Sequence, residues 1–119
     1  MDDSRPIFAQ VAENIENDII SGALPEEGQV PSTNEFAAFY RINPATALKG
    51  VNVLVDEGIL YKKRGIGMFV ATGAQEQITG ARRDKFSSEY VRPLLAEAEK
   101  LGINSTQLTQ MIAKEAKNS

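Results

Sequence analysis

The stretch STNEFAAFYRINPAT, residues 32–46, decides the fold, because it holds two helix starts separated by a short turn. Ser32 and Glu35 form a capping box, in which the serine oxygen accepts the Glu35 N–H and the glutamate accepts the Ser32 N–H. Asn43 is a typical N-cap residue, and Pro44 suits the first position of a helix. The sequence therefore predicts two helices around a tight turn, over about 32–39 and 44–57.

The segments on both sides of this pair extend the pattern. Apolar residues at helical spacing predict a helix over about 6–21, which Gly22 ends. A loop over 23–31 follows, with a short extended piece at Gln29–Val30. Downstream, Ile59–Lys63 and Met68–Val70 are predicted strands, joined by a basic, glycine-rich tip over residues 64–67. Phe8, Phe36, Phe39 and Phe69 are the aromatic candidates for the core.

The C-terminal part of the chain is predicted to form amphipathic helices. A helix is predicted from about Gln75, with a kink or a break near residues 90–92 caused by Pro93. Asn104 caps a last predicted helix over about 105–117. Forty-six residues in two helices bury too little apolar surface on themselves, so we expect a second chain to cover it. The predicted dimerisation residues are Phe86, Tyr90, Leu94, Ala98, Leu101, Leu108, Met111 and Ile112.

Composition narrows the class of protein. The chain has 119 residues, a net charge of −3, and neither cysteine nor histidine, so no disulfide, thiolate nucleophile or structural zinc site is expected. The carboxylates lie in capping positions or on amphipathic faces, which argues against an enzyme, and no cofactor or metal is expected. No apolar run approaches the roughly 20 residues of a membrane span, and the acidic N-terminus lacks a secretory pattern. The expected location is the cytoplasm.

Helix, helix, tight turn, helix and hairpin is the order of a winged helix-turn-helix, in which the third helix enters the DNA major groove. The predicted fold class is therefore mostly α (α+β). Residues 1–73 form the predicted DNA-binding domain with its β-hairpin wing. Residues 74–119 form a short two-helix dimerisation segment that is also the candidate effector segment.

Six short motifs add a specific resemblance, and they cover about residues 5–71. They are Pro6–Phe8, Ser21–Gly22, Val30–Ser32, Ile42–Thr46, Asp56–Leu60 and Arg64–Val70. In this order and spacing they closely resemble the GntR family of bacterial transcription regulators. The Asn-Pro-x-Thr variant and the short C-terminal piece look like the YtrA-type subfamily, whose members carry about two dimerising helices. The resemblance implies a homodimeric repressor on an inverted-repeat operator in double-stranded DNA, released by an unidentified small-molecule effector.

The candidate DNA-binding residues combine helix starts, one lysine and the wing. Helix N-termini attract phosphates, and a glycine-rich wing lets the backbone approach them. Lys49 matches a basic family position and is the best single candidate for a phosphate or guanine contact. The full set is Ser32, Thr33, Asn34, Arg41, Asn43, Ala45, Thr46, Lys49, Arg64, Gly65 and Gly67.

The chain departs from the family at several positions. Asn34, Pro44 and Leu48 stand where relatives have arginine, and Ile66 is at the wing tip. Leu48 against a thymine methyl and Asn34 against adenine would favour an AT-leaning operator.

Two other interpretations remain open. The basic run Lys62–Arg64 is also what a solvated strand edge uses to resist edge-to-edge pairing. The acidic balance and the missing arginines suit a winged helix that docks on protein, without sequence-specific DNA binding. Salt dependence separates these functions, since DNA binding releases counterions and an apolar protein interface does not.

Overall fold

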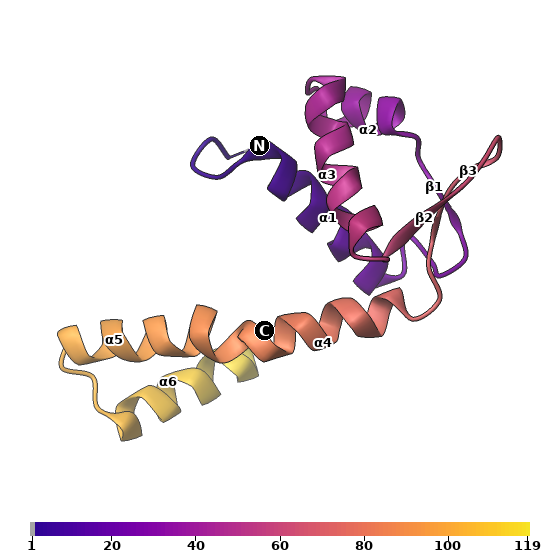
Figure 1. The fold of residues 1–119 in the computed structure, drawn as a ribbon. Helices are drawn as coiled ribbons and strands as arrows, with labels where there is room; N and C mark the ends of the chain where they lie inside the picture. Colours follow the sequence, from indigo (N-terminus) through magenta and orange to yellow (C-terminus); the bar gives the residue numbers. More distant parts are fainter. Residues whose placement is uncertain (1) are drawn as a thin grey trace. The chain divides into compact units, whose positions relative to one another are not determined.

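The computed structural model describes residues 2–119, which form two compact units, the first ending at Gly80 and the second running from Ala81 to Ser119. The first unit holds three helices, α1 (Ile7–Ser21), α2 (Thr33–Tyr40) and α3 (Pro44–Asp56), and three short strands, β1 (Gln29–Val30), β2 (Leu60–Lys63) and β3 (Gly67–Val70). Figure 1 shows α3 beside both α1 and α2, with the strands at one side of these helices. The first half of α4 (Ala74–Phe86) also belongs to this unit.

The helix boundaries follow the predicted caps. Ser32 and Glu35 form the complete capping box at the start of α2. The Asn43 side chain accepts the Ala45 N–H at 2.8 Å, with Pro44 as the first residue of α3. Gly22 ends α1 with φ of +88°, a conformation that glycine adopts at little cost. The predicted helices in this unit are therefore confirmed to within a residue or two.

The sheet has the order β1-β3-β2, and all its pairs are antiparallel. Strands β2 and β3 form the predicted hairpin, with Lys63 opposite Gly67 at the tip. The extended piece at Gln29–Val30 is a third strand, with Val30 opposite Met68. The sequence indicated the extended piece but not its pairing, because no local pattern specifies which strand a two-residue segment joins.

A single apolar core holds the first unit together. Val11, Ile15, Val51, Leu54 and Val70 are fully buried within it. Burying one such side chain contributes roughly 1.5–3 kcal/mol. Ala74 and Ile78 join the same core, so the first turns of α4 pack as part of the winged helix. The boundary between the two compact units thus lies inside α4, after Gly80, whereas the sequence predicted that the DNA-binding domain ends at residue 73.

The prediction that Phe39 belongs to the core is wrong. Phe36 is buried and Phe8 and Phe69 are half-buried, but Phe39 is 79% exposed. The buried face of α2 contains Phe36 and Ala37. Phe39 lies on the side away from Ala37, because two residues along an α-helix turn by roughly 200°.

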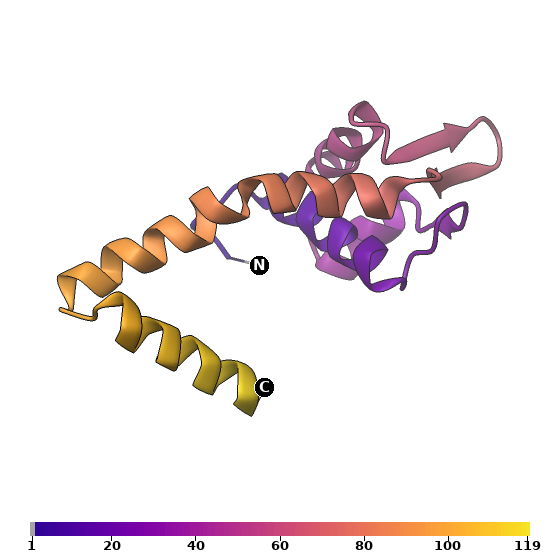
Figure 2. The same cartoon turned by 90° about the horizontal axis from the view of Figure 1, so that it is seen from below.

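The second unit is helical throughout. It contains the end of α4, the π-helix η1 (Ser87–Val91), α5 (Arg92–Lys100) and α6 (Ser105–Asn118). The predicted break before Pro93 is the π-helical turn, since proline has no N–H to continue the α-helical pattern. The chain then reverses after Leu101, and Asn104 and Gln107 form a capping box for α6. Figure 2 shows α5 and α6 joined by this short turn.

Candidate nucleic-acid interface

The outward face of α3 is the first part of the candidate interface. Ala47, Gly50, Val51 and Leu54 are buried and form the inner stripe of this helix. Ala45, Leu48 and Lys49 are exposed on the remaining face. A helix that follows a helix-turn-helix turn presents the residues of this face, near its N-terminus, to base edges. Leu48 is 42% exposed there, so the centre of the face is apolar.

Lys49 is placed by an aromatic ring. Its ammonium lies 4.2 Å from the centroid of the Phe8 ring on α1. An exposed cation–π contact contributes about 0.5–1 kcal/mol, which is enough to favour one side-chain position. The charge is therefore held near the start of α1.

The two helix starts differ in the donors they leave free. At α3, Pro44 has no N–H, Ala45 donates to the Asn43 side chain, and the Thr46 N–H donates to the Asn43 carbonyl at 3.0 Å. At α2, the capping box uses the Glu35 N–H, and among the described residues no acceptor lies within hydrogen-bonding distance of the Thr33 N–H. The start of α2 is thus the better anion site.

A carboxylate also stands at the start of α2. The Ser32 N–H donates to Glu35 Oε1 at 3.0 Å and holds the pKa of the Glu35 carboxyl below its usual range. Glu35 is therefore ionised at neutral pH and offsets part of the attraction that the helix end exerts on a phosphate.

Arg41 occupies the turn between α2 and α3. It ends α2 with φ of +56°, and its N–H donates to the carbonyls of Ala37 and Ala38. The left-handed conformation costs a residue other than glycine about 1–2 kcal/mol. Helix-turn-helix turns often use glycine, so an exposed arginine in this conformation points to a use for its side chain.

The wing tip is a tight turn stabilised from β1. The Ile66 N–H donates to the Lys63 carbonyl at 3.0 Å, and Gly65 has φ of +75° at the third position of the turn. Gln29 Nε2 donates to the Ile66 carbonyl at 3.1 Å. A Cβ on Gly67 would lie 2.5 Å from this nitrogen, which ends a flexible side chain that can move aside, so the φ of +143° is what favours glycine here.

A groove of about 420 Å³ joins the wing to the start of α2. It is lined by Ser32, Thr33 and the wing residues from Lys62 to Met68. The structure thus brings together five predicted DNA-binding residues from distant parts of the chain, Ser32, Thr33, Arg64, Gly65 and Gly67. Lys62 and Lys63 also line the groove. They were absent from the predicted set, although the run Lys62–Arg64 was the available signal.

The remaining predicted residues lie outside this groove, on α2, the turn and α3. They are Asn34, Arg41, Asn43, Ala45, Thr46 and Lys49. None of the predicted DNA-binding residues is buried, and only Thr33 and Thr46 are half-buried. All of them are therefore accessible to a ligand.

The second unit carries an exposed apolar surface. Of the predicted dimerisation residues, Ala98 and Leu108 are buried within the unit itself. The other six are between 43% and 66% exposed: Phe86, Tyr90, Leu94, Leu101, Met111 and Ile112. A groove of about 540 Å³ on this surface is lined by Leu94, Leu108, Met111, Ile112, Glu115, Ala116 and Ser119.

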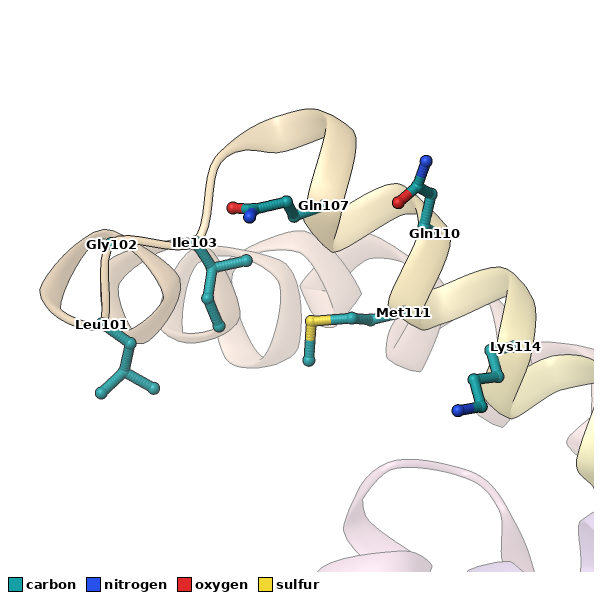
Figure 3. A pocket seen from close by; sticks show the side chains of 7 residues that line it. All are labelled: Leu101, Gly102, Ile103, Gln107, Gln110, Met111 and Lys114. Carbon is teal, nitrogen blue, oxygen red and sulfur yellow. The ribbon is translucent and has the colours of Figure 1, made fainter.

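A second hollow of about 460 Å³ lies where the turn after α5 meets α6. Figure 3 shows Met111 extending from α6 toward Ile103, with Gln107 and Gln110 further along the hollow's edge. In residues 2–119 no group of acidic side chains is arranged to hold a metal ion. Within that same range, every helix is too short or too polar to cross a bilayer.

A helix-turn-helix followed by a basic β-hairpin, with its outward helix face exposed, defines a winged-helix DNA-binding transcription regulator. The family model described as bacterial regulatory proteins, gntR family, matches residues 8–70. The chain belongs to this family, and the predicted resemblance is confirmed. The family consists of DNA-binding regulators and not of enzymes.

Relatives from Bacillus subtilis (strain 168) show how far the likeness extends. The HTH-type transcriptional repressor NagR is 35% identical over 72 residues, which are 60% of this chain and 30% of NagR. The HTH-type transcriptional repressor YtrA is 25% identical over 109 residues, which are 92% of this chain and 83% of YtrA. The chain therefore spans less than a third of NagR but most of YtrA.

Solved structures give the same assignment. A transcriptional regulator of the GntR family from Bacteroides thetaiotaomicron has a TM-score of 0.76 and 33% identity, covering 94% of this chain and 97% of that one. The AraR DNA-binding domain in complex with operator ORX1 has a TM-score of 0.54 and 34% identity, covering 56% of this chain and 81% of that one.

Proposed function

We propose that the chain is a repressor that binds an inverted-repeat operator as a homodimer and is released by a small molecule acting on the geometry of the dimer. The observation that carries the dimer is the exposed apolar surface of the second unit, since surfaces of this kind mark association sites. A two-fold dimer presents two winged helices to two half-sites. The cytoplasm is the proposed location, because a bacterial operator lies there.

The proposed DNA contacts divide by role. The start of α2, Arg41 and the wing groove bind phosphates, and so does Lys49 from its place over Phe8. The side chains at Asn34, Ala45 and Leu48 are the candidates for base edges. Support for this division comes from their exposure and from the helix-turn-helix geometry, in which the start of α3 faces the major groove.

The first test is selection of an operator from random duplexes, followed by fluorescence anisotropy at two salt concentrations. We expect one inverted repeat to be enriched, with binding that weakens steeply as salt rises. Lys49→Ala should reduce the magnitude of the salt slope by about 2, because the dimer loses one phosphate contact in each half-site. Glu76→Ala, on the exposed first turn of α4, is the control. No enrichment at either salt concentration would contradict the proposal.

A contact between Leu48 and a thymine methyl has its own test. Operator thymines are replaced one at a time by deoxyuridine, which removes only the methyl group. At one position in each half-site we expect the single replacement to lower affinity about fourfold, since one buried methyl is worth ~0.8 kcal/mol. In Leu48→Ala the same replacement should have no effect. Equal losses in both proteins, or a GC-rich half-site core, would exclude this contact.

A second candidate function is protein docking on the winged helix. Phe39 is exposed and packs edge-on against Tyr40, beside an apolar groove of about 290 Å³ that also includes Leu24 and Pro31. The salt series separates the two candidates, because affinity for a protein partner at such an apolar groove would change little with salt.

A further inference from the structure

Two adjacent carboxylates fasten the segment that leads from the wing into α4. Glu26 lies in the loop before β1. Its Oε1 accepts the Gly73 N–H at 2.9 Å, and its Oε2 accepts the Gln75 N–H at 3.1 Å. These are donors at the N-terminus of α4 that the helix cannot satisfy itself, so a residue distant in sequence caps this helix.

Glu27 binds the neighbouring part of the same segment. Its Oε1 accepts the Tyr61 hydroxyl on β2, and its Oε2 accepts the N–H of Thr72 at 3.0 Å and the Thr72 hydroxyl at 2.7 Å. The Tyr61 hydroxyl, more than any other contact, lowers the pKa of Glu27 below its usual range, so the carboxylate is ionised at neutral pH. Glu27 therefore links the wing strand to the connecting segment.

The backbone of Glu27 adopts a strained conformation. Its φ is +63°, in the left-handed region that disfavours side chains, and its N–H donates to the Val70 carbonyl at 2.8 Å. This conformation costs about 1–2 kcal/mol relative to a residue such as glycine. The hydrogen bonds that the Glu27 carboxylate accepts explain why a glutamate occupies this strained position.

Two glutamines complete the attachment of α4. Gln75 Nε2 donates to the Ile20 carbonyl at the end of α1 at 2.7 Å, and Gln77 Nε2 donates to the Glu57 carbonyl after α3 at 2.9 Å. With Ala74 and Ile78 in the core, residues 74–80 are a fixed part of the winged-helix unit. These contacts therefore fix the orientation of residues 74–80 within that unit.

We propose that Glu26 and Glu27 are positioning residues that fix the direction of α4 and thereby set the half-site spacing that the dimer accepts on DNA. The inference rests on the proposed binding of an inverted repeat by a homodimer. Moving one half-site by a base pair shifts it by about 3.4 Å and rotates it by roughly 35° about the duplex. A rigidly attached α4 cannot follow this change, whereas a loosened one can.

The test compares full-length wild type with the double variant Glu26→Gln and Glu27→Gln. Each is titrated with operators whose half-sites are moved by one or two base pairs in either direction, and with an isolated half-site. Wild type should prefer its own spacing at least tenfold. In the double variant this preference should fall below about threefold, while affinity for the isolated half-site stays unchanged. Glu76→Gln removes one carboxylate charge from the first turn of α4 by the same type of substitution and should behave as wild type.

Amide hydrogen exchange on the free proteins tests the attachment without DNA. In the double variant we expect faster exchange at Gly73 and Gln75, with Val51 and Leu54 in the core unaffected. Unchanged exchange together with unchanged spacing preference would overturn the inference. A different result would be that wild type binds no inverted repeat while exchange at Gly73 and Gln75 is still faster in the variant. That result would show that the proposed dimeric function fails, and not the attachment of α4.

Discussion

Gly50→Ala is expected to destabilise the winged-helix unit by about 2 kcal/mol, although alanine is the better helix former. A Cβ at Gly50 would lie 2.7 Å from the Phe8 carbonyl oxygen and 3.0 Å from Val11 Cβ and Cγ1. The nearest atom belongs to the backbone of α1, so no rotamer change relieves the contact. Helices α1 and α3 must separate, and the core between them loosens.

Gly80→Ala is the matched control for this prediction. Gly80 also lies inside a helix, α4, but a Cβ there would meet no atom within 4 Å. The same substitution should therefore stabilise the chain by about 1 kcal/mol through helix propensity. Urea unfolding monitored by circular dichroism measures both. If the two variants changed the free energy of unfolding in the same direction, close packing at Gly50 would not be the reason for its glycine.

Ile112→Glu is expected to lower affinity for the full inverted repeat by about 10² to 10⁴-fold, to the level of an isolated half-site. Ile112 is 52% exposed on α6, beside Met111 and the groove of the second unit. A charge there should leave the protomer folded but prevent burial of this surface against a second copy. Each half-site is then bound by a separate protomer, and the gain in affinity from joining the two protomers is lost. Sedimentation velocity should show a monomer where wild type shows a dimer.

Ala113→Glu adds the same charge one residue further along α6. Position 113 is exposed and lies about 100° around the helix from Ile112. We expect this variant to stay dimeric and to bind the operator like wild type. Dimeric Ile112→Glu, or a monomer that keeps full operator affinity, would contradict the proposed role of this surface.

The helix boundaries could be predicted because the signals for them are local. The Ser32–Glu35 capping box, the Asn43–Pro44 start and the Gly22 stop each act within a few residues, and each is present in the structure as expected. The π-helical turn before Pro93 follows in the same way from a missing N–H. Such features need no information about distant parts of the chain.

The exposure of Phe39 was decided by the tertiary structure. An aromatic residue in a short helix has no local signal for which neighbours will cover it, and Phe39 has few. The two helix starts differ already in sequence, because Pro44 has no N–H and Asn43 accepts the next donors of α3, whereas the Ser32–Glu35 capping box leaves the Thr33 N–H of α2 free.

By itself the sequence determined the order of helices and strands and the basic wing, because periodicity and capping are properties of neighbouring residues. Only the tertiary structure placed Ser32 and Thr33 beside the wing in one groove. It alone showed that Glu26 and Glu27 bind Gly73, Gln75, Tyr61 and Thr72. Hydrogen bonds between residues more than thirty positions apart depend on how the whole core packs, and no short pattern encodes them.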